Sequence, residues 1–251
     1  MSSPAVSSVA IGVDLAWGQR GRTGLAAVTP GGELVAMDTA RTDDEIRHWL
    51  QVHAHGPCVV AFDAPLIVRN ATGMRDCERA VGKRFGGRNA SCYPSNLANR
   101  NFADGGRGWR LSEQLGLDTR LENTGPRRAI EVYPHAALVS LFDLPTVLRY
   151  KRGRGRTVEV RRAEMLRLVN LVASLRTAEP ELHVEGNEAW AAAHTSLDEA
   201  TRPMHLNAVE DAIDAVICAY VALLALQAPD RAETFGSEAG SAIIVPRPAL
   251  T

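Results

Sequence analysis

Asp211 and Asp214 are the residues whose spacing most strongly suggests chemistry. They lie three residues apart in the apolar stretch 207–226, NAVEDAIDAVICAYVALLAL. We expect a buried helix there, capped by Asn207, with Glu210 completing a capping box. Residues three apart share a helix face, and an ionised carboxylate on an apolar helix is costly unless it is paired or binds a metal. Either basic side chains or a cation must therefore reach these two aspartates.

Two further aspartates end apolar runs that resemble strands. Asp14 closes the run 9–14, and Asp63 follows the run 58–62. Ligands of open α/β sheets bind at the carboxyl ends of strands, so neighbouring strands would place both aspartates side by side. Four converging carboxylates would need a cation, and Mg²⁺ or Mn²⁺ prefers such oxygen ligands. Two such ions could cleave a phosphodiester. The alternatives are turn-forming or capping aspartates, and pairing of Asp211 with an arginine.

The predicted elements can position these residues. Short apolar runs at 9–14, 25–28 and 34–37, with a Pro-Gly-Gly turn at 30–32, indicate an antiparallel meander. The capping-box sequence at 42–45 begins a helix that extends to about His53. After this crossover, the run 58–62 is apolar on both faces, as in a central parallel strand. Further elements are expected as a strand at 129–133, helices at 135–142 and 159–175, and a strand at 240–245.

Two segments carry an excess of positive charge. Residues 69–88 hold six basic and two acidic residues, and residues 149–162 hold seven basic and one acidic residue. Such segments suit an anionic ligand, although a solvated surface would have the same composition. Residues 70–126 are rich in Gly, Asn and Arg, with helices expected near 74–84 and 112–115. We interpret this stretch as an insertion or an active-site cover.

Bulk composition describes an ordinary globular chain. The 251 residues are 45% hydrophobic and 23% charged, and the net charge of −1 is not that of a typical nucleic-acid binder. No apolar run is long enough to span a membrane. The four cysteines form no CxxC pair, which indicates a reducing compartment, and we expect a cytoplasmic protein. The oligomeric state stays open, with a homo-oligomer as one option.

The order of these motifs resembles the ribonuclease-H-like fold, and the paired aspartates resemble its Holliday-junction resolvase branch. More narrowly, the chain resembles the domain of unknown function 429, a family predicted to be nucleases of this fold. The matching segments cover nearly the whole chain: GVDLAW (12–17), FDAPL (62–66), EVYPH (131–135), Tyr150-Lys151 and EDAIDAVICAY (210–220). The resemblance implies one α/β domain over 1–251. Its mixed sheet would have three antiparallel strands and then parallel strands, flanked by helices, with the insertion at about 70–126.

The leading hypothesis is a metal-dependent nuclease acting on DNA or RNA. Its metal ligands are expected to be Asp14, Asp63, Asp211 and Asp214. The family pattern adds Glu131, which could complete the metal shell, bind a basic side chain or face solvent. Candidate phosphate ligands are Arg75, Arg79, Arg88 and Lys151, with ion pairing within a helix or plain solvation as the alternatives.

Two other functions remain open at this point. An actin-like or sugar-kinase-like phosphotransferase would place Asp14 and the following Gly18 beside ATP phosphates. Such enzymes use two domains and a second Asp-Gly hairpin, which the sequence does not offer. The other alternative is a non-catalytic adaptor that retains the fold.

Overall fold

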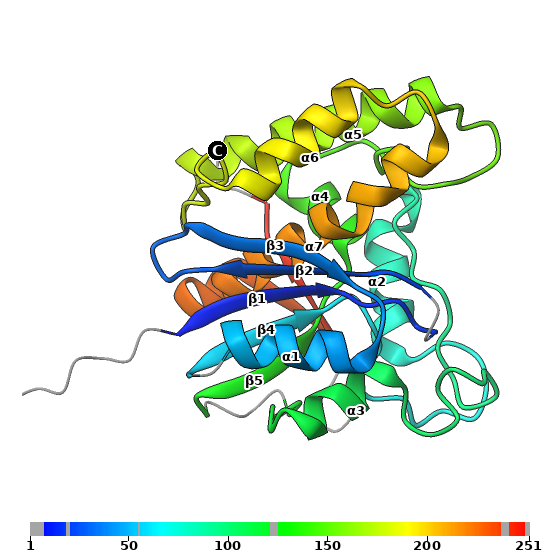
Figure 1. Ribbon diagram of the computed structural model, residues 1–251. Helices are drawn as coiled ribbons and strands as arrows, with labels where there is room; N and C mark the ends of the chain where they lie inside the picture. The colour runs from blue at the N-terminus through cyan, green and yellow to red at the C-terminus, as the bar shows by residue number, and fades with distance from the viewer. Residues whose placement is uncertain (1–7, 19–20, 55, 121–124, 237–240, 249–251) are drawn as a thin grey trace, which may run out of the picture.

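The chain forms a mixed α/β structure around a five-stranded sheet (Figure 1). The computed structural model describes residues 8–18, 21–54, 56–120, 125–236 and 241–248. The strand order is β3-β2-β1-β4-β5. The strands are β1 (Val9–Asp14), β2 (Thr23–Val28), β3 (Leu34–Ala40), β4 (Cys58–Phe62) and β5 (Arg127–Glu131).

Strand directions bring three acidic residues to one edge of the sheet. The first three strands form the antiparallel meander predicted from the sequence, and β4 and β5 continue the sheet parallel to β1. Val13 pairs with Phe62, and Phe62 pairs with Glu131. Asp14 and Asp63 therefore follow paired positions on adjacent strands, and Glu131 lies level with them on the next strand. The predicted adjacency of the first and fourth strands is confirmed.

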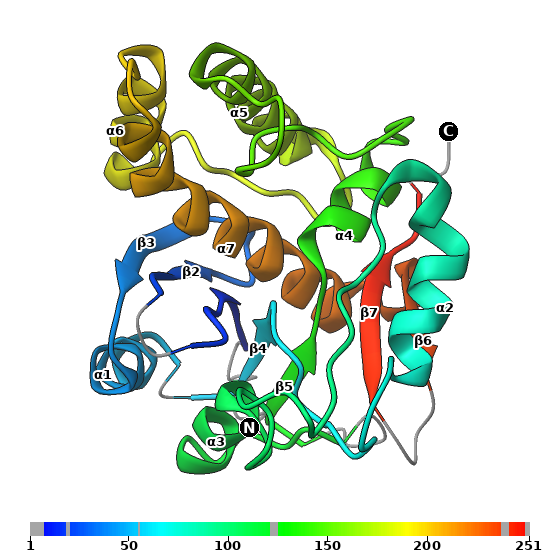
Figure 2. The ribbon, with the colours of Figure 1, turned by 90° about the vertical axis from the view of Figure 1, so that its right-hand side faces the viewer.

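Helices within the described residues flank the sheet on both faces. They are α1 (Asp43–His53), α2 (Asp76–Phe85), α3 (Arg107–Gln114), α4 (Pro134–Leu141), α5 (Val158–Ser174), α6 (Glu188–Asp198) and α7 (Pro203–Gln227). The core on one face joins α7 to Ala26 and Ala61 of the sheet. The core on the other joins α1 and α3 to Val13 and Phe62. In Figure 2, α7 runs across its face of the sheet as one long helix.

Three helices differ from the sequence predictions, two in where they begin and one because it was not predicted. The last helix begins at Pro203, whose missing N–H suits the first helical position, so the prediction that Asn207 caps it is wrong. Helix α3 begins at Arg107, five residues before the predicted start, because Gly105 and Gly106 adopt positive φ angles just before it. Helix α6 was not predicted, although Asn187 caps it by accepting a hydrogen bond from the Trp190 N–H.

Two glycines let α7 approach the sheet closely. A Cβ atom placed on Gly12 would lie 1.9 Å from the Ala215 carbonyl oxygen, and one on Gly24 would lie 1.8 Å from the Asp211 carbonyl oxygen. No larger side chain fits at either position without moving the helix. Because Gly24 pairs with Asp14 across the strands, this close packing sets the position of Asp211 and Asp214 over the sheet edge.

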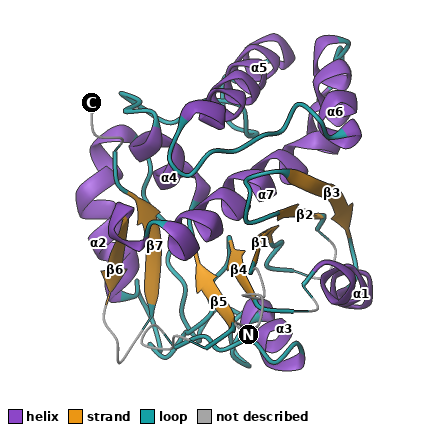
Figure 3. Cartoon of the chain, turned by 90° about the vertical axis from the view of Figure 1, so that its left-hand side faces the viewer, coloured by secondary structure: helices purple, strands orange, loops and turns teal. Residues whose placement is uncertain are grey.

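A small hairpin completes the structure beside the main sheet. Strands β6 (Ala232–Gly236) and β7 (Ala242–Pro246) pair antiparallel and pack against α2 (Figure 3). A bridge from Val132 to Ile244 joins this hairpin to the chain just after β5. The predicted last strand is thus present, although its first residue, Gly240, lies outside the described residues. Among the described helices, none has the length and apolarity needed to cross a membrane.

Candidate active site

Asp14 and Asp63 meet at the carboxyl ends of β1 and β4. The Asp63 N–H donates to the Val13 carbonyl over 2.8 Å, which holds the two chain segments together just beyond the strands. The two carboxyl groups lie close enough that the charge of Asp63 raises the pKa of Asp14. Burial raises the pKa of Asp63 to about 7, with Lys151 opposing the shift and Asp214 adding to it. Burial likewise raises the pKa of Asp14 well above its usual range. Near neutral pH, the pair therefore tends to retain a proton.

Asp214 is fully buried, and its charge acts on both members of this pair. The Tyr150 hydroxyl donates to its Oδ1 over 2.8 Å, and the Lys151 Nζ lies 2.7 Å from its Oδ2. Burial alone would lower the pKa of Lys151, but Asp214 and Asp14 raise it well above its usual range. Lys151 is therefore an ammonium ion in contact with Asp214 and close to Asp14 and Asp63. The sequence left two alternatives for the partner of Asp214, a basic side chain or a cation. In the structure the partner is a basic side chain, Lys151.

Asp211 faces a different space from Asp214. It lines an open groove of about 720 Å³ on the other side of Lys151, together with Arg22, Arg41, Arg152, Asn207 and Glu210. Burial and the nearby Asp214 raise the pKa of Asp211 to about 6. Positions three apart on a helix differ by about 60° in direction, which is enough to direct the two carboxylates into different surroundings. Asp14 and Asp63 thus line the cavity and Asp211 lines the groove, although the charges of Asp211 and Asp214 both act on Asp14.

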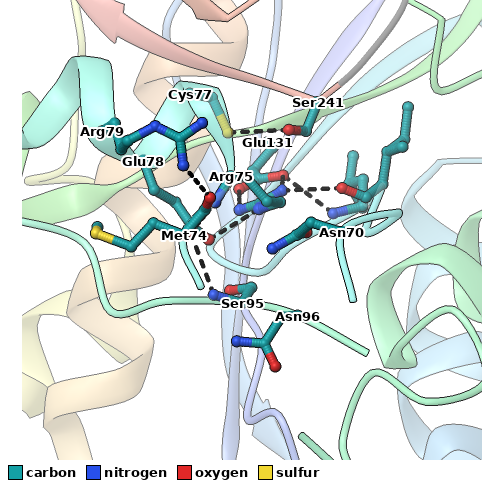
Figure 4. Close-up of polar contacts among 12 residues, drawn as sticks. Asn70, Met74, Arg75, Cys77, Glu78, Arg79, Ser95, Asn96, Glu131 and Ser241 are labelled. Carbon is teal, nitrogen blue, oxygen red and sulfur yellow. Dashed lines mark hydrogen bonds and ion pairs between the residues drawn. The ribbon is translucent and has the colours of Figure 1, made fainter. Parts of the chain in front are cut away.

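Glu131 is held in a saturated ion-pair network (Figure 4). Both of its carboxylate oxygens accept from Arg75, at 2.8 and 2.5 Å, and Oε2 also accepts from the Leu66 N–H. The Arg75 Nε donates to Glu78, whose other oxygen accepts from the Arg75 and Ser95 N–H groups. Arg75, Glu78 and Glu131 are all almost completely buried. Of the three roles left open for Glu131, binding a basic side chain is the one observed.

The other predicted phosphate ligands lie in two kinds of surroundings. Lys151 lines both the cavity beside Asp14 and the neighbouring groove. Arg79 is exposed and pairs with Asp76 of its own helix, and in Figure 4 its guanidinium is directed toward the carbonyl of Met74. Arg88 is exposed and pairs with Asp143. Neither Arg79 nor Arg88 lines the cavity or the groove.

A cavity of about 300 Å³ opens onto the Asp14–Asp63 pair. Its lining combines these carboxylates and Lys151 with aromatic rings: Trp17, Tyr93, Tyr133 and His135. The Tyr93 side chain is 77% exposed, so its ring is available to a ligand at the mouth of the cavity. The cavity thus offers charged groups at its base and flat apolar surfaces around them, as in sites that bind small ligands or nucleobases.

The matching family model is described as Protein of unknown function (DUF429) and spans residues 12–240. The chain belongs to this family. No curated protein and no solved structure matches it.

The DUF429 match contains the whole site, from Asp14 to Asp214. Two residues of this site were quoted in the sequence motifs without a role of their own. Tyr150 binds Asp214, and His135 lines the cavity with a buried Nδ1 that lacks a hydrogen-bond partner among the described residues. Burial, assisted by Lys151, lowers the pKa of His135 to about 4, so this ring is neutral near pH 7. The only sequence signal for a role of His135 and Tyr150 was their position in the motifs, where His135 follows Pro134 and Tyr150 precedes Lys151.

A divalent cation fits part of this DUF429 site. Among the described residues, no three His, Cys, Asp or Glu side chains are grouped so that they could hold a metal ion, and Lys151 already neutralises Asp214. Asp14 and Asp63 differ, because burial raises the pKa of both and the charge of Asp63 adds to the shift at Asp14, so additional positive charge beside them would favour their ionised forms. Carboxylate oxygens of this kind suit Mg²⁺ or Mn²⁺.

Proposed function

We propose that this protein is a divalent-metal-dependent nuclease with a ribonuclease-H-like fold. The fold assignment is supported by the sheet, in which an antiparallel meander continues into two parallel strands in the order β3-β2-β1-β4-β5. The observation that carries the functional proposal is that Asp14 and Asp63, which follow paired positions on adjacent strands, line the same cavity. Two carboxyl groups from adjacent strand ends, both with raised pKa values, form the part of the site that a cation would stabilise.

In this proposal, Mg²⁺ or Mn²⁺ is held by Asp14 and Asp63, with Asp211 and Asp214 outside the direct ligand pair. The bound ion would supply Lewis-acid stabilisation of the charge that develops on a phosphodiester during cleavage. Lys151 adds a fixed ammonium beside the pair, held in place by Asp214. Tyr150 restrains Asp214 through its hydroxyl, so the position of the ammonium depends on both residues.

The remaining cavity residues bind and orient the substrate. Trp17, Tyr93 and Tyr133 offer rings on which a nucleobase can stack, and such stacking does not require a particular base sequence. His135, which is neutral near pH 7, lines the same cavity and can contact the ligand there. Arg75 and Glu131 form the wall of the cavity and keep its shape without acting on the phosphate, because their polar atoms already bind each other.

A nuclease assay tests this proposal. Wild-type protein is incubated with single-stranded and duplex DNA and RNA, with Mn²⁺, with Mg²⁺ and with a chelator. We expect cleavage that requires the metal and falls by 100-fold or more, about 2.7 kcal/mol of transition-state stabilisation, in Asp14→Asn and Asp63→Asn. Asp76→Asn, which removes an exposed carboxylate of α2, is the matched control and should cleave normally. Cleavage that persists in both site variants, or no cleavage of any substrate, would contradict the proposal.

A further inference from the structure

The groove that contains Asp211 is lined by the basic side chains of Arg22, Arg41, Lys151 and Arg152. We propose that it binds a backbone phosphate of a nucleic-acid strand whose neighbouring phosphodiester lies at the Asp14–Asp63 pair. This inference rests on the proposed function and makes it more specific, because it assigns a polynucleotide strand as the substrate. Lys151 lines both the groove and the cavity and therefore marks where they adjoin.

The groove brings together cations from segments far apart in the sequence. Arg22 immediately precedes β2, Arg41 immediately follows β3, and Arg152 follows Lys151 in the loop before α5. Among the described residues, none of these three arginines makes an ion pair, whereas Glu210 of the same groove is already paired with Arg161 at 2.8 Å. Local positive charge is therefore in excess, although the whole chain has a net charge of −1.

Asn207 organises this cationic surface. Its backbone carbonyl accepts from the Arg22 Nη1 at 2.8 Å, and its side-chain Oδ1 accepts from the Arg152 Nε at 3.2 Å and the Arg161 Nη2 at 2.9 Å. One residue of the first turns of α7 thus fixes three guanidinium groups. Arg22 and Arg152 each keep further N–H donors for a ligand, and guanidinium groups match the geometry of phosphate oxygens.

A second anchor holds the Arg41 side of the groove. Arg107 is almost completely buried and donates to the carbonyls of Arg41, at 3.2 Å, and Ala16, at 2.9 Å. Its Nε also donates to Asp43 over 2.6 Å. The backbone of Arg41 is therefore tied to the loop that follows Asp14. A groove held at the Arg41 and Asn207 sides, and joined to the cavity at Lys151, suits a ligand that carries negative charge along its length.

The test measures binding without turnover. A fluorescent single strand of about 12 nucleotides, as DNA and as RNA, is titrated with wild-type protein in a chelator while anisotropy is followed at several salt concentrations. We expect Arg41→Ala/Arg152→Ala to weaken binding by about tenfold and to reduce the salt slope by about 0.7 for each lost phosphate contact. The matched control is Arg79→Ala/Arg88→Ala, which removes two exposed arginines outside the groove and should bind as wild type does.

Each outcome decides the inference separately from the proposed function. Equal affinities for the two double variants, both still folded by thermal melting, would overturn the groove assignment even if the protein cleaves nucleic acid. No binding of either strand by wild type would also overturn it. If the groove variant loses affinity for a nucleoside monophosphate by the same factor as for the strand, the groove binds a small ligand and the strand assignment is wrong. Selective loss of strand binding in a protein that cleaves nothing would support the groove and contradict the nuclease proposal.

Discussion

Two acidic sites lie at neighbouring strand ends, and they differ in how their carboxyl groups are paired: Glu131 is buried against an arginine, whereas Asp14 and Asp63 are partly exposed in a cavity. Around Glu131, both carboxylate oxygens and the Arg75 guanidinium are matched by hydrogen bonds and ion pairs. Around Asp14 and Asp63, two carboxyl groups line one cavity and no arginine binds them among the described residues. Burial raises the pKa of Asp14, Asp63 and Glu131, but only at Glu131 does a bound arginine oppose the shift. A network in which every buried polar group has its partners stabilises the fold only while it is complete. A group of carboxyls without such partners lowers the stability of the fold. The comparison therefore assigns a structural role to the first site and a ligand-binding role to the second.

The largest expected effect comes from breaking the saturated site. Glu131→Gln leaves the Arg75 and Glu78 side chains buried with one fewer negative charge, and the loss of a partner from a buried ion pair costs about 3–5 kcal/mol. Asp14→Asn in metal-free protein should leave the stability equal or higher, because it removes repulsion. Urea unfolding of both variants, in a chelator, measures the difference. Equal destabilisation of the two variants would remove the distinction between the sites.

The next largest effect concerns the packing of α7. Gly24→Ala pushes a Cβ against the Asp211 carbonyl and should cost about 1–3 kcal/mol, because overpacking displaces the helix. The displacement should also impair the Asp214–Lys151 contact while leaving the Arg75 network intact. Gly186→Ala is the control, since nothing lies within 4 Å of its added Cβ. A normal unfolding midpoint for Gly24→Ala would show that α7 does not rest on this glycine.

The pH dependence of stability sharpens the comparison further. Asp63 has a pKa of about 7 in the folded state and an ordinary pKa of 3.8 when unfolded, so the folded state binds more protons between these values. The contribution of Asp63 to the free energy of unfolding therefore falls as pH rises from about 4 to about 7, and this contribution changes little above that range. Urea unfolding of metal-free wild type and Asp63→Asn across this range isolates the effect. The difference in stability between the variant and wild type should grow toward pH 7, and a constant difference would contradict the assignment.

The smallest effect is expected at the exposed ion pair of α2. Arg79 was predicted from the sequence as a phosphate ligand, but it pairs with Asp76 at the surface. Exposed pairs contribute about 0–1 kcal/mol, so Arg79→Ala should change stability by less than 1 kcal/mol. Strand affinity and cleavage should stay unchanged. A tenfold loss of affinity for the strand in Arg79→Ala would instead indicate that Arg79 contacts the nucleic acid.

The sequence predicted the sheet edge because local patterns determine it. Apolar runs that end in Asp14 and Asp63 specify strands, and the helical crossover between them implies a parallel pair. The starts of two helices were predicted wrongly, because tertiary context rather than the local sequence decides where these helices begin. Gly105 and Gly106 resembled a loop but immediately precede α3, and Asn207 resembled a helix cap although the helix begins at Pro203.

Pairings between distant residues could not be predicted from local patterns. Lys151 reaches Asp214 across 63 positions of the chain, and Arg75 reaches Glu131 across 56. Helical spacing indicated that Asp211 and Asp214 need partners, and Asp214 has Tyr150 and Lys151. The spacing could not show that Asp211 lines a separate groove. That separation depends on the angle at which α7 crosses the sheet, which the contacts at Gly12 and Gly24 set.

The most direct test of the central claim is calorimetric titration of Mn²⁺ in buffers of different ionisation enthalpy near pH 6.5. If Asp14 and Asp63 hold the ion, binding should release a proton from the pair, because the pKa of Asp63 is about 7 without metal. Asp14→Asn and Asp63→Asn should lose both the binding and the proton release, while Asp76→Asn should keep both. Mn²⁺ binding of unchanged affinity in the two site variants would contradict the claim that this pair is the metal site.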